Sequence, residues 1–403
     1  MDRAVSYTFV EAFLFGTCNL KCGYCWFAES GKVLDASELA RFRDQAVIEQ
    51  IANFFNKRTT EKEKWHLLVT GGEPLLMPNF PTFAKKLFAQ GNKISCYTAL
   101  LIPRNHPSFQ CLIEHGASEF GYIMASFHPE AELQEEEYWR KIQLLKDRGH
   151  QVIVRFVGHP KRLHLMERLS KTCEELGVCF YPTSLFSKNY PAAYLEQERE
   201  LLRSHFSSLS QAIQLEGGLD TNETLCSAGS ELISIDFTSG DIWPCISTQT
   251  PVLGNIYTDQ FSPLKAPIVC PKAGEIACFC DIHYQQNIVI GSDDRQCFER
   301  AQAGFVKPIP IPEQNQRLKE RKLKFTKAPQ RIGEVVDDQV LIYPKEIVKR
   351  RFEENFGKHL IQLPTSAPAT LPAQEAQAQL ASLPTTPPSR AGLRAKLMSL
   401  FGF

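Results

Sequence analysis

The sequence predicts an α/β fold built on a parallel sheet. Within residues 1–182, short apolar runs that favour strands alternate with longer segments whose apolar residues recur at helical spacing. Six strand–helix units with short connections follow one another, which favours parallel strands joined by right-handed crossovers. With 403 residues, the chain is long enough to bury a substantial core in one large domain or two.

Each element of this first part has a local signal. Residues 7–15 alternate as a strand does, and residues 36–56 carry apolar residues at helical spacing, with Ser37 as a candidate N-cap. Residues 65–69 form a second apolar run that leads into two glycines, which indicates a strand followed by a turn. We expect the remaining strands at residues 93–99, 120–127, 151–156 and 178–181, and further helices at residues 81–90, 133–148 and 163–176.

The chain changes character after residue 182. A helix is expected over residues 195–214, and residues 231–237 alternate before a turn at Ser239 and Gly240, which predicts a hairpin. The expected domains are residues 1–182, a small cysteine-rich domain at 183–290, an unassigned extension at 291–363, a flexible Pro- and Ala-rich linker at 364–389, and a short basic amphipathic helix at 390–403.

Composition argues against several classes of protein. The formal net charge is zero and 22% of residues are charged, which gives no electrostatic case for nucleic acid or an anionic membrane. The N-terminus lacks the regions of a signal peptide, and no apolar run approaches the roughly 18 residues of a transmembrane helix. The 13 cysteines therefore favour thiolate metal ligands over disulfides, and we expect a cytoplasmic protein.

Three cysteines near the N-terminus, Cys18, Cys22 and Cys25, have the spacing CxxxCxxC. Three thiolates in one short loop can hold three irons of a cubane [4Fe–4S] cluster, which leaves the fourth iron open to a small molecule. Zinc is the alternative, but it usually needs four Cys or His ligands, and no fourth lies within ten residues of the triplet. A second motif, Gly71-Gly72-Glu73-Pro74, directly follows the second expected strand.

Both motifs, in this order and after these strands, resemble those of the radical S-adenosylmethionine (radical SAM) enzymes. The resemblance covers about residues 5–285 and implies a partial (β/α)6 barrel. It implies that Cys18, Cys22 and Cys25 hold a [4Fe–4S] cluster whose fourth iron binds SAM. Reductive cleavage of SAM would then give a 5′-deoxyadenosyl radical that abstracts hydrogen from a substrate.

The resemblance also implies a SAM site in the two motifs. Tyr24 matches an aromatic residue beside the adenine, with loop packing as the alternative. Gly71 and Gly72 would let the backbone approach SAM, with Pro74 closing the motif. Glu73 would accept hydrogen bonds from the SAM amine, with a helix N-terminal carboxylate as the alternative.

Further SAM contacts are expected at later strand ends, where ligands sit in such sheets. Thr98 stands where many relatives have Thr-Asn-Gly, although this chain continues with alanine and leucine. Ser126 matches a serine that contacts the SAM carboxylate or ribose, and His128 is either structural or a substrate-facing acid or base. Arg155, on an apolar strand, needs an anionic partner, either the SAM carboxylate or a buried ion pair.

A second cysteine group follows, and it consists of Cys226, Cys245, Cys270, Cys278 and Cys280. It resembles the C-terminal extension called twitch or SPASM, which implies one auxiliary [4Fe–4S] cluster with ligands from these five, and a structural zinc is the rival. The other cysteines within expected strands and helices, Cys96, Cys111, Cys173 and Cys179, are expected to be buried packing residues.

The resemblance implies oxidation or crosslinking of a peptide or small molecule, with an external electron donor. The first strand begins within ten residues of the start, which leaves no room for a preceding peptide-binding domain and favours a separate partner protein or a small-molecule substrate. Two alternatives are a non-catalytic iron–sulfur or zinc scaffold acting through its C-terminal helix, and an RNA-modifying radical SAM enzyme, against which the neutral charge balance argues.

Overall fold

The computed structural model describes residues 5–20, 22–25, 39–187, 189–247, 251–275, 277–278, 288–289, 304–325, 340 and 346. In this part of the chain, ten strands form one sheet in the order β11-β10-β9-β8-β1-β2-β3-β4-β5-β6, and β7 pairs with β12. The strands are β1 Ser6–Phe13, β2 Glu63–Thr70, β3 Lys93–Thr98, β4 Phe120–Ser126, β5 Val152–Val157, β6 Cys179–Thr183, β7 Leu225–Cys226, β8 Leu232–Asp236, β9 Asp241–Trp243, β10 Gly254–Asn255, β11 Gln260–Phe261 and β12 Ile268–Val269.

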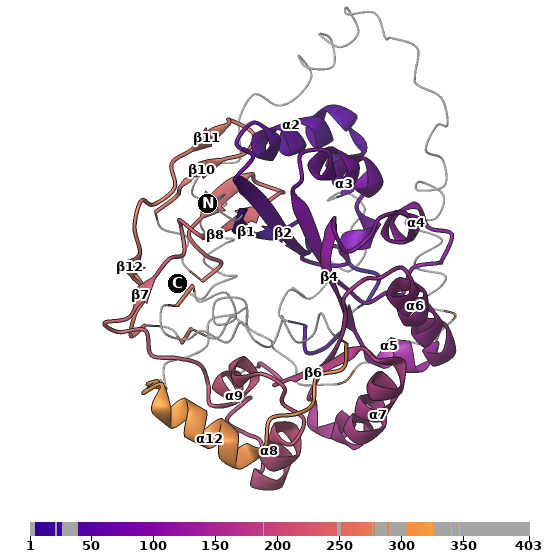
Figure 1. Ribbon diagram of the computed structural model, residues 1–403, viewed down its shortest axis with the longest axis vertical. Helices are drawn as coiled ribbons and strands as arrows, with labels where there is room; N and C mark the ends of the chain where they lie inside the picture. Colours follow the sequence, from indigo (N-terminus) through magenta and orange to yellow (C-terminus); the bar gives the residue numbers. More distant parts are fainter. Residues whose placement is uncertain are drawn as a thin grey trace, which may run out of the picture.

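Strands β1 to β6 pair in chain order, and every pair is parallel. Helices of the intervening crossovers lie along the outside of the sheet (Figure 1). This arrangement confirms the predicted α/β class and the parallel sheet, because each crossover returns the chain to the same end of its neighbour. The carboxyl ends of all six strands consequently meet at one edge, where the candidate site lies.

Several helices agree with the sequence pattern except at their ends. The helical elements are η1 Arg41–Arg43, α2 Gln45–Asn56, η2 Pro74–Leu76, α3 Phe80–Phe88, α4 Pro107–Glu114, α5 Pro129–Glu132, α6 Glu135–Asp147, η3 Pro160–Leu165, α7 Met166–Leu176, α8 Glu196–Arg203, α9 Leu209–Leu215 and α12 Ile311–Glu320. The candidate cap Ser37 lies outside the described residues, and α2 is instead capped by Asp44, whose Oδ1 accepts the N–H of Ala46 at 2.8 Å. Helix α4 was not predicted.

The single helix expected over residues 195–214 is two helices. Helix α8 ends at Arg203, and α9 begins after Ser208, whose hydroxyl accepts the N–H of Ser210 at 3.1 Å. The side chain of Gln211 accepts the Ser208 N–H in return, which completes a capping box. The start of α9 within this stretch is therefore set by one serine.

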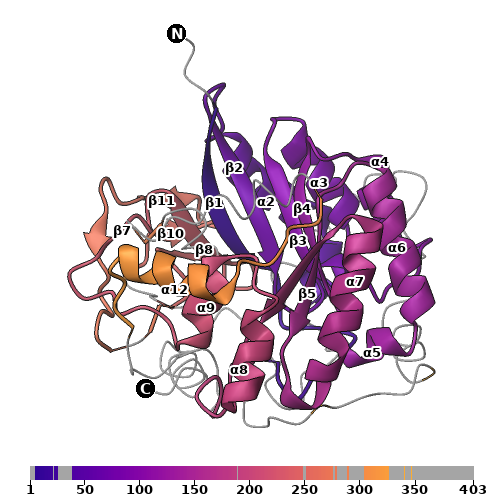
Figure 2. The ribbon, with the colours of Figure 1, turned by 60° about the horizontal axis from the view of Figure 1, so that its bottom comes forward.

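The cysteine-rich part of the chain continues the sheet of the first part. Strand β8 pairs parallel with β1, and the β8–β9 pair is antiparallel, which confirms the predicted hairpin. Helix α12 lies beside α8 and α9 in both views (Figures 1 and 2), where the Gln314 side-chain amide donates to Arg203 O at 2.8 Å. The expected linker at 364–389 and helix at 390–403 lie outside the described residues.

Alternation along each strand gives the sheet two buried faces. Residues such as Val10, Leu67 and Val154 face the helices, whereas Leu68, Met124 and Ile153 belong to a separate apolar cluster on the other face, which we call the inner face. The cysteines at positions 96, 111, 173 and 179 are buried packing residues, as predicted. Within the described ranges, no helix has the length and apolar character needed to cross a bilayer.

Replacing Asp44 with alanine should destabilise α2, because the Ala46 N–H loses its acceptor. The expected loss in the free energy of unfolding is about 1 kcal/mol. Urea unfolding of the full chain, followed by circular dichroism, measures it. The matched control Asp44→Asn keeps an acceptor oxygen and should stay close to the wild type; equal losses in both variants would contradict this account of the cap.

Candidate active site

The cysteine loop is held by backbone hydrogen bonds that continue the β1–β2 ladder beyond both strands. Leu14 N donates to Thr70 O at 3.1 Å, Gly72 N donates to Phe15 O at 2.8 Å, and Glu73 N donates to Thr17 O at 3.0 Å. The loop after β1 and the turn after β2 therefore form one unit. The two sequence motifs, separated by more than forty residues, meet here because parallel strands bring their carboxyl ends together.

Gly71 and Gly72 are required by this backbone contact. A Cβ on Gly72 would lie 1.8 Å from Thr17 O, and one on Gly71 would lie 2.4 Å from Phe15 O. Gly71 also has a φ of 126°, which side-chain-bearing residues rarely adopt. The glycines therefore let the turn approach the cysteine loop, a reason that adds to the expected approach of SAM.

Within the described part of the chain, the three cysteines of the loop form no disulfide. Burial raises the pKa of Cys18 and Cys22 well above the usual range, and the neighbouring thiols of the same loop add to the rise. The N–H of Leu20 donates to Cys18 Sγ at 3.3 Å. Three cysteine sulfurs in one short loop are the donor type that an iron–sulfur cluster takes, and iron would have to displace their protons.

The type of donor atoms and the anchoring of the loop decide whether a cluster fits this site. Among the described residues, no three His, Cys, Asp or Glu side chains are arranged around a common metal position. The buried side chain of Asn19 donates to Leu101 O at 3.2 Å and ties the cysteine loop to the segment after β3. The sequence analysis did not identify Asn19, since an asparagine between cysteines carries no signal of its own.

Glu73 is buried and accepts three hydrogen bonds. Its Oε1 accepts from the Thr98 hydroxyl at 2.7 Å and from Leu75 N at 3.1 Å, and its Oε2 accepts from Ala99 N at 2.8 Å. Burial raises the pKa of Glu73, while these donors lower it. Thr98 and Glu73 thus join the ends of β3 and β2. Glu73 is also the N-cap of η2, which agrees with its expected alternative role as a helix N-terminal carboxylate.

The segment after Thr98 has an unusual backbone. Leu100 has a φ of 53°, in the left-handed region that favours glycine, and its N–H donates to the Thr98 hydroxyl at 3.0 Å. Lys141 Nζ, buried on α6, donates to Leu100 O at 2.9 Å, and burial lowers the pKa of Lys141 to about 8. Leu100 therefore adopts a left-handed turn conformation although it is not glycine, and its backbone carbonyl is bound by the buried Lys141 ammonium.

Tyr24 and His128 lie against each other beside the second cysteine. Tyr24 Oη is 3.0 Å from His128 Nδ1, which is 3.5 Å from Cys22 Sγ. The two rings are nearly parallel, with centroids 6.1 Å apart. Burial lowers the pKa of His128 to about 3, with Arg162 and Arg155 adding to the effect. The buried Arg162, which the sequence analysis missed, also donates to Phe127 O at 3.1 Å.

Ser126 and Arg155 are register partners at the carboxyl ends of β4 and β5. Among the described residues, Arg155 has no ion-pair partner, and its buried Nε has no hydrogen-bond partner. Its guanidinium carbon lies 6.0 Å from the centroid of the Tyr97 ring. An ordinary buried ion pair, one of the two expectations for Arg155, is therefore not seen in this part of the chain.

The inner face carries polar groups that the sequence analysis did not identify. Ser234 on β8 donates to Glu11 Oε2 at 2.6 Å, and Glu11 is buried on β1. The hydroxyls of Tyr97 and Tyr122 are 3.1 Å apart. Glu11 alternates with the helix-facing residues of an otherwise apolar strand, and this lone carboxylate was the signal that could have revealed it.

The second cysteine group is brought together only in part. Cys226 on β7 pairs with Ile268 on β12, two residues before Cys270. Burial raises the pKa of Cys226 to about 11, and Cys270 adds to the rise. Cys245 belongs to the inner-face apolar cluster against which Cys226 packs. The backbone of Cys278 bonds to that of Leu219, and Cys280 lies outside the described residues.

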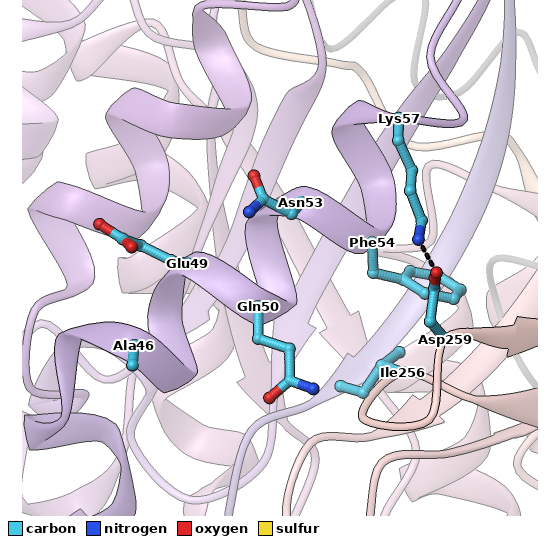
Figure 3. Close-up of a pocket in the computed structure, with 8 residues that line it drawn as sticks. All are labelled: Ala46, Glu49, Gln50, Asn53, Phe54, Lys57, Ile256 and Asp259. Carbon is cyan, nitrogen blue, oxygen red and sulfur yellow. Dashed lines mark ion pairs between the residues drawn. The ribbon is translucent and has the colours of Figure 1, made fainter. Parts of the chain in front are cut away.

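A surface pocket of about 390 Å³ lies between α2 and the turn that follows β10 (Figure 3). Lys57 and Asp259 form an ion pair at its rim, and the Gln50 side-chain amide donates to Tyr257 O at 2.7 Å. Its lining contains no cysteine or histidine and none of the predicted site residues. The pocket is therefore separate from the cysteine loop and from the groups that surround it.

One family model matches the first part of the chain. Residues 13–169 match the model described as "Radical SAM superfamily". This superfamily implies an enzyme that uses a [4Fe–4S] cluster and SAM. No curated protein matches the chain.

Several solved structures are similar to the chain at low identity. Streptococcus suis SuiB is 16% identical with a TM-score of 0.40, and the match covers 60% of this chain and 61% of SuiB, less than two thirds of its length. SuiB bound to precursor peptide SuiA is 16% identical with a TM-score of 0.39, and the match covers 60% of each chain. A tagged form of anSMEcpe with bound AdoMet is 16% identical with a TM-score of 0.44, and the match covers 89% of this chain and 98% of that chain.

Replacing Gly72 with alanine should displace the cysteine loop, because the new methyl group would overlap Thr17 O. The expected result is a lower iron content after anaerobic reconstitution, measured by elemental analysis. Gly116→Ala is the matched control, because nothing lies within 4 Å of a Cβ at that position. An iron content in Gly72→Ala equal to that of the control would contradict this role for the glycine.

Proposed function

We propose that this protein is a radical SAM enzyme that oxidises or crosslinks a peptide or a small molecule. The observation that carries the proposal is the CxxxCxxC loop at the end of β1, inside the segment that matches the radical SAM family and hydrogen-bonded to the Gly-Gly-Glu turn after β2. Cys18, Cys22 and Cys25 would hold the [4Fe–4S] cluster. Together, the cluster and SAM supply a 5′-deoxyadenosyl radical that abstracts hydrogen from the substrate.

The residues around the loop are suited to bind and orient SAM. Ser126 and Arg155 are register partners, so a hydroxyl and a guanidinium lie side by side and could both contact the SAM carboxylate. A carboxylate has about four acceptor positions, and the three donors to Glu73 leave one on Oε2 for the SAM amine. Thr98 fixes that carboxylate, and Tyr24, Gly71, Gly72 and Pro74 complete the proposed site.

The inner face is the proposed substrate site. It combines apolar residues such as Met124 and Ile153 with the Glu11–Ser234 pair and the two tyrosine hydroxyls. A mostly apolar wall with a few fixed polar groups is typical of a site that orients a ligand. We propose that this face binds a peptide or a small molecule. The proposal also includes an external electron donor, a separate partner protein and a cytoplasmic location.

An auxiliary [4Fe–4S] cluster is proposed for the second cysteine group, within a twitch/SPASM-like domain at residues 183–290. The pairing of Cys226 with Ile268, two residues before Cys270, supports it. The other ligands would come from Cys245, Cys278 and Cys280. Such a cluster would supply an electron-accepting site for a net oxidation. Zinc remains the rival metal for four thiolates.

Replacing Cys18, Cys22 or Cys25 with alanine should abolish reductive SAM cleavage. The loss should be at least about 100-fold, since mutating groups one shell further from a metal already costs roughly 10- to 100-fold. The measurement is 5′-deoxyadenosine formed by reconstituted protein with dithionite and SAM. Cys111→Ala, at a buried cysteine outside both groups, is the control. Product formation by a loop variant at the control's rate would refute the proposed function.

Metal analysis of anaerobically reconstituted wild-type protein tests the auxiliary cluster separately. Two cubanes predict about eight irons per chain, and the double variant Cys226→Ala, Cys245→Ala should fall to about four. About four irons with one zinc per wild-type chain would refute the auxiliary cluster and leave the first one standing.

A further inference from the structure

The imidazole of His128 lies against a proposed cluster ligand and has no part in the function proposed above. Its Nδ1 is 3.5 Å from Cys22 Sγ and 3.0 Å from Tyr24 Oη. Both distances lie within the range of hydrogen bonds to sulfur and oxygen. His128 follows β4 directly, so its place is set by the sheet, and it is the N-cap residue of α5 without making a side-chain cap bond.

Several contacts hold the backbone around His128 in place. The backbone N–H of His128 donates to Ser126 O at 3.2 Å, and its carbonyl accepts from Ala131 N at 2.9 Å. Arg162 donates to Phe127 O at 3.1 Å and to Glu132 Oε1 at 2.8 Å, which clamps the turn on both sides of His128. These contacts fix the backbone around His128, and the contacts of Nδ1 with Tyr24 Oη and Cys22 Sγ place the ring next to the cysteine.

The direction of the hydrogen bond follows from the chemistry of the sulfur. A cysteine that ligates iron has lost its proton and can only accept, so Nδ1 must be the donor. Hydrogen bonds to cluster sulfurs are one of the factors that set the reduction potential of an iron–sulfur cluster. A donated hydrogen bond stabilises the reduced form, because reduction adds negative charge that the sulfurs share.

We propose that His128 is a positioning residue that donates a hydrogen bond from Nδ1 to Cys22 Sγ and makes the SAM-binding cluster easier to reduce. The inference rests on the proposed function, since Cys22 must be a ligand. Tyr24 shares the same nitrogen, so its hydroxyl competes with the sulfur for the Nδ1 proton.

The test is a redox titration of the full reconstituted chain, followed by electron paramagnetic resonance. The signal that changes when SAM is added identifies the cluster concerned. His128→Leu removes the donor and should lower the reduced fraction at a fixed potential about tenfold, a shift of about 59 mV for one electron. His128→Asn returns an N–H near the position of Nδ1 and should restore most of the difference. Tyr24→Phe removes the competitor and should not lower the potential.

A second measurement uses the wild-type protein alone. Pulsed electron paramagnetic resonance of the reduced protein should detect weak coupling to a histidine nitrogen, and ¹⁵N-histidine labelling should change that coupling. An unchanged potential in His128→Leu with full iron content would overturn the proposal, and so would the absence of histidine coupling in the wild type. If His128→Leu fails to assemble a cluster, the histidine coupling in the wild type and the reduction potential of Tyr24→Phe test the proposal instead. A wild-type chain without a cluster would refute the proposed function, and this inference with it.

Discussion

The candidate site depends on the hydrogen bonds that extend the β1–β2 ladder past the ends of both strands. Gly72 N to Phe15 O and Glu73 N to Thr17 O join the cysteine loop to the turn that carries the buried carboxylate. A side chain on either glycine would push the two backbones apart. The loop is therefore positioned by backbone contacts that do not involve its three sulfurs, and the neighbouring strand ends are placed by the same register.

Buried polar groups then connect the remaining strand ends. Glu73 bonds to Thr98 and Ala99, Lys141 bonds to the Leu100 carbonyl, and Arg162 bonds to the Phe127 carbonyl. An unmade hydrogen bond is costly in a dry interior, so each of these groups fixes the backbone that it contacts. Arg155 differs from these groups, because among the described residues its buried Nε has no hydrogen-bond partner and its guanidinium forms no ion pair. A charged group that the protein itself leaves without a counter-charge is well placed to bind an anionic part of a ligand.

The sequence alone predicted the α/β class, most strands and the meeting of the two motifs, because hydrophobic periodicity and parallel topology determine all three. It did not predict the break between α8 and α9 or the start of α2, which single capping residues decide. It also missed Arg162, Asn19 and Glu11. Arg162 and Asn19 become significant only through tertiary contacts with carbonyls far along the chain, and no local pattern marks such contacts, whereas Glu11 was marked by its place on its strand. The role of the two glycines was likewise visible only once their close approach to Phe15 and Thr17 was known.

The parallel pairing of β8 with β1 has a consequence for how the chain is made. The two strands are joined by a hydrogen bond between residues 223 positions apart, so β1 remains an open edge while the ribosome synthesises everything between them. At ordinary elongation rates this interval is roughly 11 to 45 seconds. During that time an apolar strand with unpaired amides leads into three reactive thiols, a combination that invites association with other nascent chains. The second edge of β1 is therefore covered late, only after residue 236 has been added, and the outer strands β9 to β11 join the sheet after that.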